Sequence, residues 1–202
     1  MRSVCNAGIL SNEKKISSEG YESTIASHLI GGSYMLSQLL LPQLKAASDK
    51  AQDPRVIFVT SGGMYLEKFP CWELATNTKK GQVYDGTAAY SRAKRGQVLL
   101  AEQLAKTESN ITWLSAHPGW VDTVGVSDAF GDSKKYLEPM RNSWEGAEGL
   151  TWLMSAKRHL LKNGEFYLDR EIQEKHLIQS LTKNNDSEIH EMISKLQEVC
   201  NL

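Results

Sequence analysis

Cysteine is scarce in this sequence, and its spacing matches no pattern of metal ligands. The 202 residues contain three cysteines, Cys5, Cys71 and Cys200, which are scattered along the chain. Zinc and cluster sites use cysteines in short, paired spacings. An odd number of cysteines is also more typical of a reducing compartment than of a disulfide framework. We therefore predict a cytoplasmic protein without a metal site.

Long apolar runs and an excess of one charge are also missing. The most apolar stretch, Met35–Leu44, is interrupted by Pro42 and is far shorter than the roughly 20 residues of a membrane-spanning helix. No apolar segment follows Arg2, so the start of the chain does not have the pattern of a secretion signal. The formal net charge is −1, whereas proteins that bind nucleic acids usually carry a surplus of positive charge. We expect neither a membrane span nor a nucleic-acid partner.

The remaining composition is that of an ordinary folded domain with a sizeable core. Hydrophobic residues make up 41% and charged residues 23% of the chain. The β-branched run at residues 55–60 is typical of a strand buried on both faces of a parallel sheet. Apolar and capping patterns predict further strands and helices: strands ending near residue 6 and at 111–116, and helices at 23–45, 89–106, 143–156 and 186–199. We predict one α/β domain over residues 1–202.

Tyr90 and Lys94 lie four residues apart at the start of one predicted helix. This spacing places both side chains on the same helical face. An ammonium group near a phenol favours the phenolate, so we expect Lys94 to lower the Tyr90 pKa from about 10. Such a tyrosine can exchange a proton with a reacting oxygen. For the pair taken alone, a solvated helix face is the alternative interpretation.

Three further motifs accompany this pair. Asn6-Ala7-Gly8 begins the series, Ser61 follows the strand at 55–60, and Pro118-Gly119-Trp120-Val121-Asp122-Thr123 follows the pair. In this order the motifs resemble the N-A-G, catalytic serine, Y-x-x-x-K and P-G-x-x-x-T elements of the short-chain dehydrogenase/reductase (SDR) family. The resemblance extends over nearly all of the chain, and four motifs in register are far more specific than any one of them.

The resemblance implies a fold, a reaction and a set of site residues. The fold is a Rossmann-like parallel sheet with flanking helices, of which about four strands remain and residues 164–169 form the last. The reaction is hydride transfer between NAD or NADP and a small carbonyl or alcohol substrate. Tyr90 would transfer the proton, Lys94 would hold the nicotinamide ribose, and Ser61 would fix the substrate oxygen. The implied cofactor-binding residues are Asn6, Ala7, Gly8, Tyr90, Lys94, Pro118, Gly119, Val121 and Thr123.

His28 is a further candidate catalytic residue. It occupies the position at which the family has an asparagine that completes a catalytic tetrad. A histidine there can carry a proton near neutral pH. A lone histidine on a helix is more often structural. Both interpretations remain open.

The sequence also departs from the family pattern at its start. The T-G-x-x-x-G-x-G turn, the first strand and two strand–helix units precede N-A-G in the family, and no G-x-G-x-x-G spacing replaces them here. We predict a domain without the Gly-rich dinucleotide-binding unit, whose exposed sheet edge favours self-association. The alternative to an oxidoreductase is an inactive truncated isoform or gene fragment that acts at most as an interaction module.

Three expectations concern local structure. Pro42 should kink or end the helix at residues 23–45. Residues 66–87 exceed the spacing in many family members, which predicts an inserted surface loop. Residues 124–145 match the substrate-covering loop of the family, with a plain exposed loop as the alternative.

Overall fold

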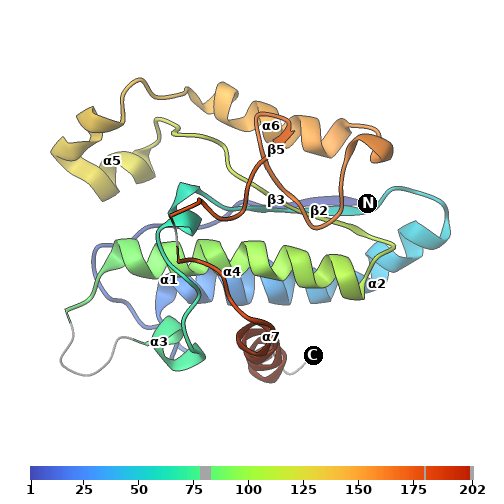
Figure 1. The fold of residues 1–202 in the computed structure, drawn as a ribbon, viewed down its shortest axis with the longest axis horizontal. Helices are drawn as coiled ribbons and strands as arrows, with labels where there is room; N and C mark the ends of the chain where they lie inside the picture. Colours follow the sequence, from blue (N-terminus) through green and yellow to red (C-terminus); the bar gives the residue numbers. More distant parts are fainter. Residues whose placement is uncertain (78–82, 180, 201–202) are drawn as a thin grey trace.

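A five-stranded sheet in the order β1-β2-β3-β4-β5 forms the centre of the protein (Figure 1). The structure is a computed structural model and describes residues 1–77, 83–179 and 181–200. Four neighbouring strands are parallel, and the short last strand is antiparallel to its neighbour. The strands are β1 (Arg2–Cys5), β2 (Arg55–Val59), β3 (Thr112–Ala116), β4 (Phe166–Leu168) and β5 (Glu171–Ile172). The predicted α/β fold with a parallel sheet is confirmed, whereas β5 was not predicted because it is too short to show a pattern.

The two central strands explain why the sheet needs a helical layer on each face. Every residue of β2 and β3 is buried. Successive side chains of a strand point to opposite faces. Accordingly, Phe58 and Trp113 pack in one core cluster, whereas Ile57 and Leu114 pack in another. Burial of both faces by helices is typical of parallel sheets.

One face is covered by the long helix that η1 and α2 form together (Ala26–Asp49), by α4 (Gly86–Thr107) and by α7 (Asp186–Cys200) (Figure 1). The C-terminal α7 packs on the outside of this layer and buries Met192 and Leu196 in the same core. Asn185 caps it, since its side chain accepts a hydrogen bond from the Glu188 amide. The elements of this layer are α1 (Ser23–Ile25), η1 (Ala26–Met35), α2 (Leu36–Asp49), α4 (Gly86–Thr107) and α7 (Asp186–Cys200).

The opposite face is covered by α6 (Ser143–Ser155), which buries Leu153 against the sheet (Figure 1). Its N-terminus has a complete capping box between Asn142 and Glu145. At its C-terminus the fully buried Arg55 donates hydrogen bonds to the carbonyl oxygens of Leu153, at 2.5 Å, and Ala156, at 2.9 Å. Arg55 also pairs with Asp53. The amino end of β2 is therefore tied to the end of α6.

The first long helix is π-helical over the ten residues of η1. Its hydrogen bonds reach one residue further than those of an α-helix. Two glycines allow this geometry: a Cβ on Gly32 would lie 2.2 Å from the Ser27 carbonyl oxygen, and one on Gly31 would lie 3.2 Å from that of Ala26. Inside the helix, the Ser33 hydroxyl donates to the His28 carbonyl oxygen at 2.6 Å.

Pro42 does not end this helix, because α2 continues through it to Asp49. Of the two predicted effects of Pro42, an end to the helix is wrong, whereas a kink stays a prediction. Proline leaves one carbonyl oxygen of the preceding turn without its usual donor. Pro42 lies on the exposed side of α2, where water can provide that donor.

Two segments predicted as loops contain helices. Within residues 66–87, α3 (Trp72–Thr76) packs Trp72 into the core together with Phe69, so this segment is not a plain surface loop. Residues 78–82 of the predicted loop lie outside the described part. Residues 124–137 form two helical segments without buried residues, and α6 begins at Ser143, so this segment is not a plain loop; its substrate-covering role stays a prediction. The remaining elements are α5 (Val124–Phe130) and the 3₁₀ turns η2 (Gly62–Tyr65), η3 (Gly131–Leu137) and η4 (Arg158–Leu160).

Among the residues that the structure describes, no helix combines the length and the apolar character needed to cross a membrane.

Candidate active site

The predicted catalytic side chains meet where the parallel strands end. Ser61 lies just beyond β2, and Tyr90 and Lys94 project from the first turns of α4. His28 comes from η1 and contacts the segment that follows β1. The carboxyl ends of parallel strands form the usual ligand-binding edge of an open α/β sheet. The structure therefore brings the four candidate catalytic residues to one place.

Gly63 lets three polar side chains approach one another. Ser61 caps the 3₁₀ turn η2, since its hydroxyl accepts a hydrogen bond from the Gly63 amide at 3.1 Å. A Cβ on Gly63 would lie 3.1 Å from the Ser61 hydroxyl oxygen, 3.2 Å from that of Ser91 and 3.4 Å from the Tyr90 ring. The Ser91 hydroxyl is buried and has no hydrogen-bond partner in the described structure. Ser91 was not predicted as a site residue, because no motif marks it.

Lys94 lies buried beside Tyr90 and is held by the neighbouring strand. Its Nζ donates to the Val59 carbonyl oxygen at 2.7 Å, and its own carbonyl oxygen accepts from the Thr60 hydroxyl at 2.9 Å. The Nζ atom lies 5.3 Å from the centroid of the Tyr90 ring, within cation–π range. An ammonium group has three hydrogens to donate. The hydrogen bond to Val59 leaves capacity for a ligand.

Burial controls the protonation of this pair. Burial raises the pKa of Tyr90, and a hydrogen bond with the Ser61 side chain offsets part of this effect. Burial also lowers the pKa of Lys94 from 10.5 to about 7. The expected lowering of the Tyr90 pKa by Lys94 is therefore wrong for this structure, because loss of water raises this pKa and the hydrogen bond with Ser61 offsets only part of the rise. Tyr90 is a neutral phenol at neutral pH and can donate a proton.

His28 connects the Asn6–Gly8 segment to η1. Its Nε2 lies 2.9 Å from both the amide nitrogen and the carbonyl oxygen of Ile9, and its ring meets that of Tyr90 edge-on at 5.3 Å. Gly8 lies against the imidazole so closely that a Cβ would be 1.8 Å from its Cε1. Burial, together with the positive charge of Lys94, lowers the pKa of His28 to about 3. The ring is neutral at neutral pH.

The Pro118–Thr123 segment is held by the layer opposite to α4. The Gly119 amide donates to His117 Nδ1 at 3.2 Å, and Gly119 adopts a φ of 81°. Val121 packs against α6, where a Cβ on Gly146 would lie 2.4 Å from it. The Thr123 hydroxyl caps α5. The Thr123 hydroxyl thus accepts a hydrogen bond from the Val126 amide, and the Val121 side chain faces α6.

The residues at the edge fit one end of a nicotinamide dinucleotide. Lys94 offers a buried amino group with unused hydrogens, Tyr90 offers a phenol, and Asn6–Gly8 is an exposed segment that contains a glycine. A pyrophosphate group is usually met by backbone amides of a glycine-rich turn at a helix N-terminus. The G-x-G-x-x-G spacing of such a turn does not occur in the sequence. The chain therefore fits the nicotinamide-ribose end.

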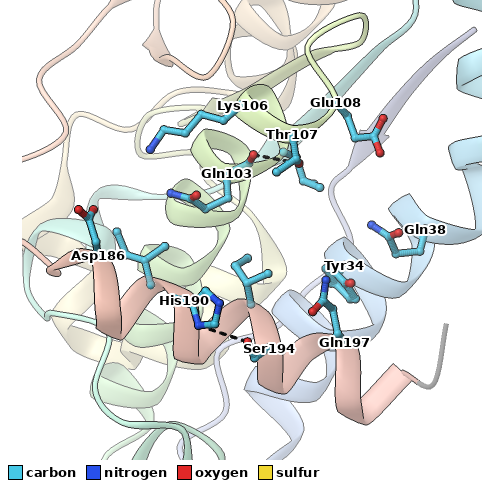
Figure 2. A pocket seen from close by; sticks show the side chains of 13 residues that line it. Tyr34, Gln38, Gln103, Lys106, Thr107, Glu108, Asp186, His190, Ser194 and Gln197 are labelled. Carbon is cyan, nitrogen blue, oxygen red and sulfur yellow. Dashed lines mark hydrogen bonds between the residues drawn. The ribbon is translucent and has the colours of Figure 1, made fainter.

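A cavity of about 540 Å³ lies elsewhere, between α4, α7 and the η1–α2 helix. Figure 2 shows side chains of all three helices around it, among them Gln103, His190 and Tyr34. It borders Lys106 and Thr107 at the C-terminal end of α4, whereas Tyr90 and Lys94 lie near the other end of that helix. None of the predicted site residues lines this cavity. Its size alone therefore does not mark the site of the predicted chemistry.

The largely parallel α/β sheet, with a serine, a tyrosine and a lysine at its carboxyl edge, places the protein in the class of Rossmann-like folds. The chain is similar over nearly its whole length to members of the short-chain dehydrogenase/reductase family. It is 33% identical over 198 residues to dehydrogenase/reductase SDR family member 12 from Homo sapiens, and 33% identical over 200 residues to the protein of that name from Bos taurus. Each alignment covers 97% of this chain and 60% of the relative, so the chain spans about 60% of their length. No family model matches the sequence.

Solved structures confirm the Rossmann-like fold. An uncharacterized protein from Mycobacterium paratuberculosis superimposes with a TM-score of 0.65 at 20% identity, covering 99% of this chain and 66% of that protein. The 3-ketoacyl-(acyl-carrier-protein) reductase from Brucella melitensis, complexed with NADH, gives a TM-score of 0.60 at 18% identity, covering 82% of this chain and 63% of the reductase. At these sequence identities, the structural superpositions establish the fold alone.

Proposed function

We propose that the chain carries the catalytic part of an NAD(P)-dependent oxidoreductase that interconverts a carbonyl and an alcohol in a small molecule. The observation that carries this proposal is the buried Lys94 beside Tyr90, with Ser61 against the same phenol, at the carboxyl edge of the sheet. Among proteins with this fold, a carbonyl reductase from chicken fatty liver binds NADPH and the Brucella reductase binds NADH. These neighbours support a nicotinamide cofactor.

Each catalytic side chain has a separate task in this proposal. The bound nicotinamide supplies or accepts the hydride. Tyr90 donates its phenolic proton to the substrate oxygen as carbonyl becomes alcohol, and Ser61 donates a hydrogen bond that orients that oxygen. Lys94 directs its free hydrogens toward the ribose hydroxyls. The residues that would line the nicotinamide end are Asn6, Ala7, Gly8, Pro118, Gly119, Val121 and Thr123.

The protonation of Tyr90 favours carbonyl reduction over alcohol oxidation at neutral pH. Burial raises the pKa of the phenol, so the proton needed for reduction is already in place. Oxidation needs the phenolate, which this environment disfavours. We assign His28 a positioning task rather than a catalytic one, because its ring is neutral and bonded to Ile9.

Tyr90→Phe tests the catalytic assignment. This change removes one hydroxyl group and should lower the rate of carbonyl reduction by about 10²–10⁴-fold with little change in melting temperature. Tyr34→Phe is the matched control, because Tyr34 is also buried but borders the distant 540 Å³ cavity. Steady-state rates on a panel of aldehydes and ketones, with NADH and with NADPH, provide the measurement. Wild-type rates in the Tyr90→Phe protein would refute the assignment.

Residues 1–202 form, in our proposal, a single catalytic unit that binds NAD(P)H weakly by itself. The chain offers residues for the nicotinamide end, and no glycine-rich turn for the pyrophosphate occurs in its sequence. Calorimetric titration with NADH and NADPH tests this point. Micromolar affinity, about −8 kcal/mol, would contradict it. Complete absence of binding, together with equal rates for wild type and Tyr90→Phe, would instead favour an inactive interaction module. We place the activity in the cytoplasm, because the three cysteines are free thiols.

A further inference from the structure

Arg141 reaches across from the start of α6 to the turn that follows β3. Its guanidinium forms a two-pronged ion pair with Asp169, in which Nη1 and Nη2 each donate to one carboxylate oxygen at 2.6 Å. The same Nη1 donates to the Pro118 carbonyl oxygen at 3.2 Å. One side chain thus joins the Pro118–Gly119 turn to the hairpin between β4 and β5. The pair raises the pKa of Arg141 and lowers that of Asp169.

The backbone around this turn is fixed by the same residue. The Arg141 amide donates to the Trp120 carbonyl oxygen at 2.7 Å, and the Asp122 amide donates to the Arg141 carbonyl oxygen at 2.8 Å. Gly119 lies against the guanidinium, since a Cβ there would be 2.6 Å from Arg141 Cζ. Both the left-handed φ of Gly119 and this close approach disfavour a side chain at that position.

The carboxylate partner is presented by an unusual hairpin. Asp169 and Arg170 connect β4 to β5 and both have positive φ values, 52° and 68°. Non-glycine residues rarely adopt this conformation, and the energetic cost is met where the surroundings hold them in place. Arg170 provides one such contact, because it pairs with Glu148 on α6. The hairpin therefore holds Asp169 in place for Arg141.

We propose that Arg141 is a positioning residue that holds the Pro118–Gly119 turn in the form that receives the nicotinamide end of the cofactor, with Asp169 fixing the orientation of its guanidinium. This inference rests on the proposed function. A planar guanidinium can bind both oxygens of Asp169 and still donate to Pro118, whereas the single ammonium of lysine does not reproduce this fork. Charge alone is therefore not enough at position 141.

Arg141→Lys and Arg2→Lys form a matched pair of variants. Both keep the charge and replace an arginine that pairs with a carboxylate, but Arg2 contacts Asp53 and Met154, whereas Arg141 contacts the turn. Amide hydrogen exchange at Asp122 and Gly119, measured by NMR without cofactor, reports the turn directly. We expect Arg141→Lys to speed exchange at both amides by about tenfold and Arg2→Lys to leave it unchanged. Equal exchange in Arg141→Lys and wild type overturns the inference.

The cofactor readout separates this inference from the proposed function. We expect Arg141→Lys to raise the KM for NADH or NADPH by about tenfold while kcat, which depends on Tyr90, changes less than twofold. Asp169→Asn should act in the same direction. Faster exchange with an unchanged KM would show that the turn is held for another purpose and overturns the inference. If wild type and all variants fail to turn over or bind the cofactor, the proposed function fails, while exchange still decides whether Arg141 fixes the turn.

Discussion

Replacing Lys94 with methionine should raise the free energy of unfolding at low pH and lower it at high pH. Lys94 is 3% exposed, and burial lowers its pKa from 10.5 to about 7. Methionine has a similar length, carries no charge and fills a buried site with little strain. The substitution removes the cost of burying an ammonium group. It also removes the hydrogen bond to the Val59 carbonyl oxygen.

The two effects differ in size. A pKa lowered from 10.5 to about 7 corresponds to about 5 kcal/mol of unfavourable free energy for the protonated form in the folded state. Loss of the hydrogen bond leaves a buried carbonyl oxygen without its donor, which costs about 1–3 kcal/mol. Below pH 7, Lys94→Met should therefore raise the free energy of unfolding by about 2–4 kcal/mol. Above pH 10.5, where lysine is neutral in both states, it should lower it by about 1–3 kcal/mol.

The sign follows from proton linkage. Between pH 7 and 10.5 the unfolded wild-type chain binds more protons at Lys94 than the folded protein does. The contribution of Lys94 to the free energy of unfolding therefore rises with pH in this window and falls as the pH decreases toward 7. The wild-type free energy of unfolding should rise relative to that of the variant by about 1.4 kcal/mol per pH unit in this window. Urea unfolding at intervals from pH 6 to 10 measures both curves. Parallel curves would refute the reasoning.

Three other predictions use different parts of the molecule. Gly8→Ala should lower stability by about 1–3 kcal/mol and displace His28, whereas Gly125→Ala, whose nearest outside atom would be 4.0 Å away, should stay within about 0.5 kcal/mol in thermal unfolding. Arg55→Met should cost about 1–3 kcal/mol for each α6 carbonyl oxygen left without a donor, and an unchanged urea midpoint would contradict the role of Arg55. Among the described residues no strand pairs with the outer edge of β1, so light scattering should show self-association that grows with concentration; a monodisperse monomer would disprove this.

Much of the fold follows from local patterns in the sequence. The run at residues 55–60 predicts β2 because a strand buried on both faces is apolar throughout. The four-residue step from Tyr90 to Lys94 predicts a shared helical face, and the structure places the two side chains together. Ser61 is predictable for a similar reason, since a residue just beyond a central parallel strand lies at the ligand-binding edge.

The remaining features depend on contacts between distant residues. The pKa of Tyr90 is set by how completely other elements exclude water, which the spacing to Lys94 does not reveal. Arg141 and Asp169 lie 28 residues apart and belong to no common motif. Phe69 and Trp72 belong to the core only because α3 folds back on it, so their segment has the composition of a loop.

The π-helical stretch η1 has a consequence for how relatives are compared. A hydrogen-bonded ring of a π-helix contains one residue more than that of an α-helix, so a relative with an α-helix here needs fewer residues to cover the same length. Deletions in homologues should therefore concentrate at residues 26–35, where Gly31 and Gly32 make the wider winding possible. Which residue of a relative is equivalent to His28 depends on this local winding. Structural superposition, rather than counting along the chain, decides whether the family asparagine and His28 share a position.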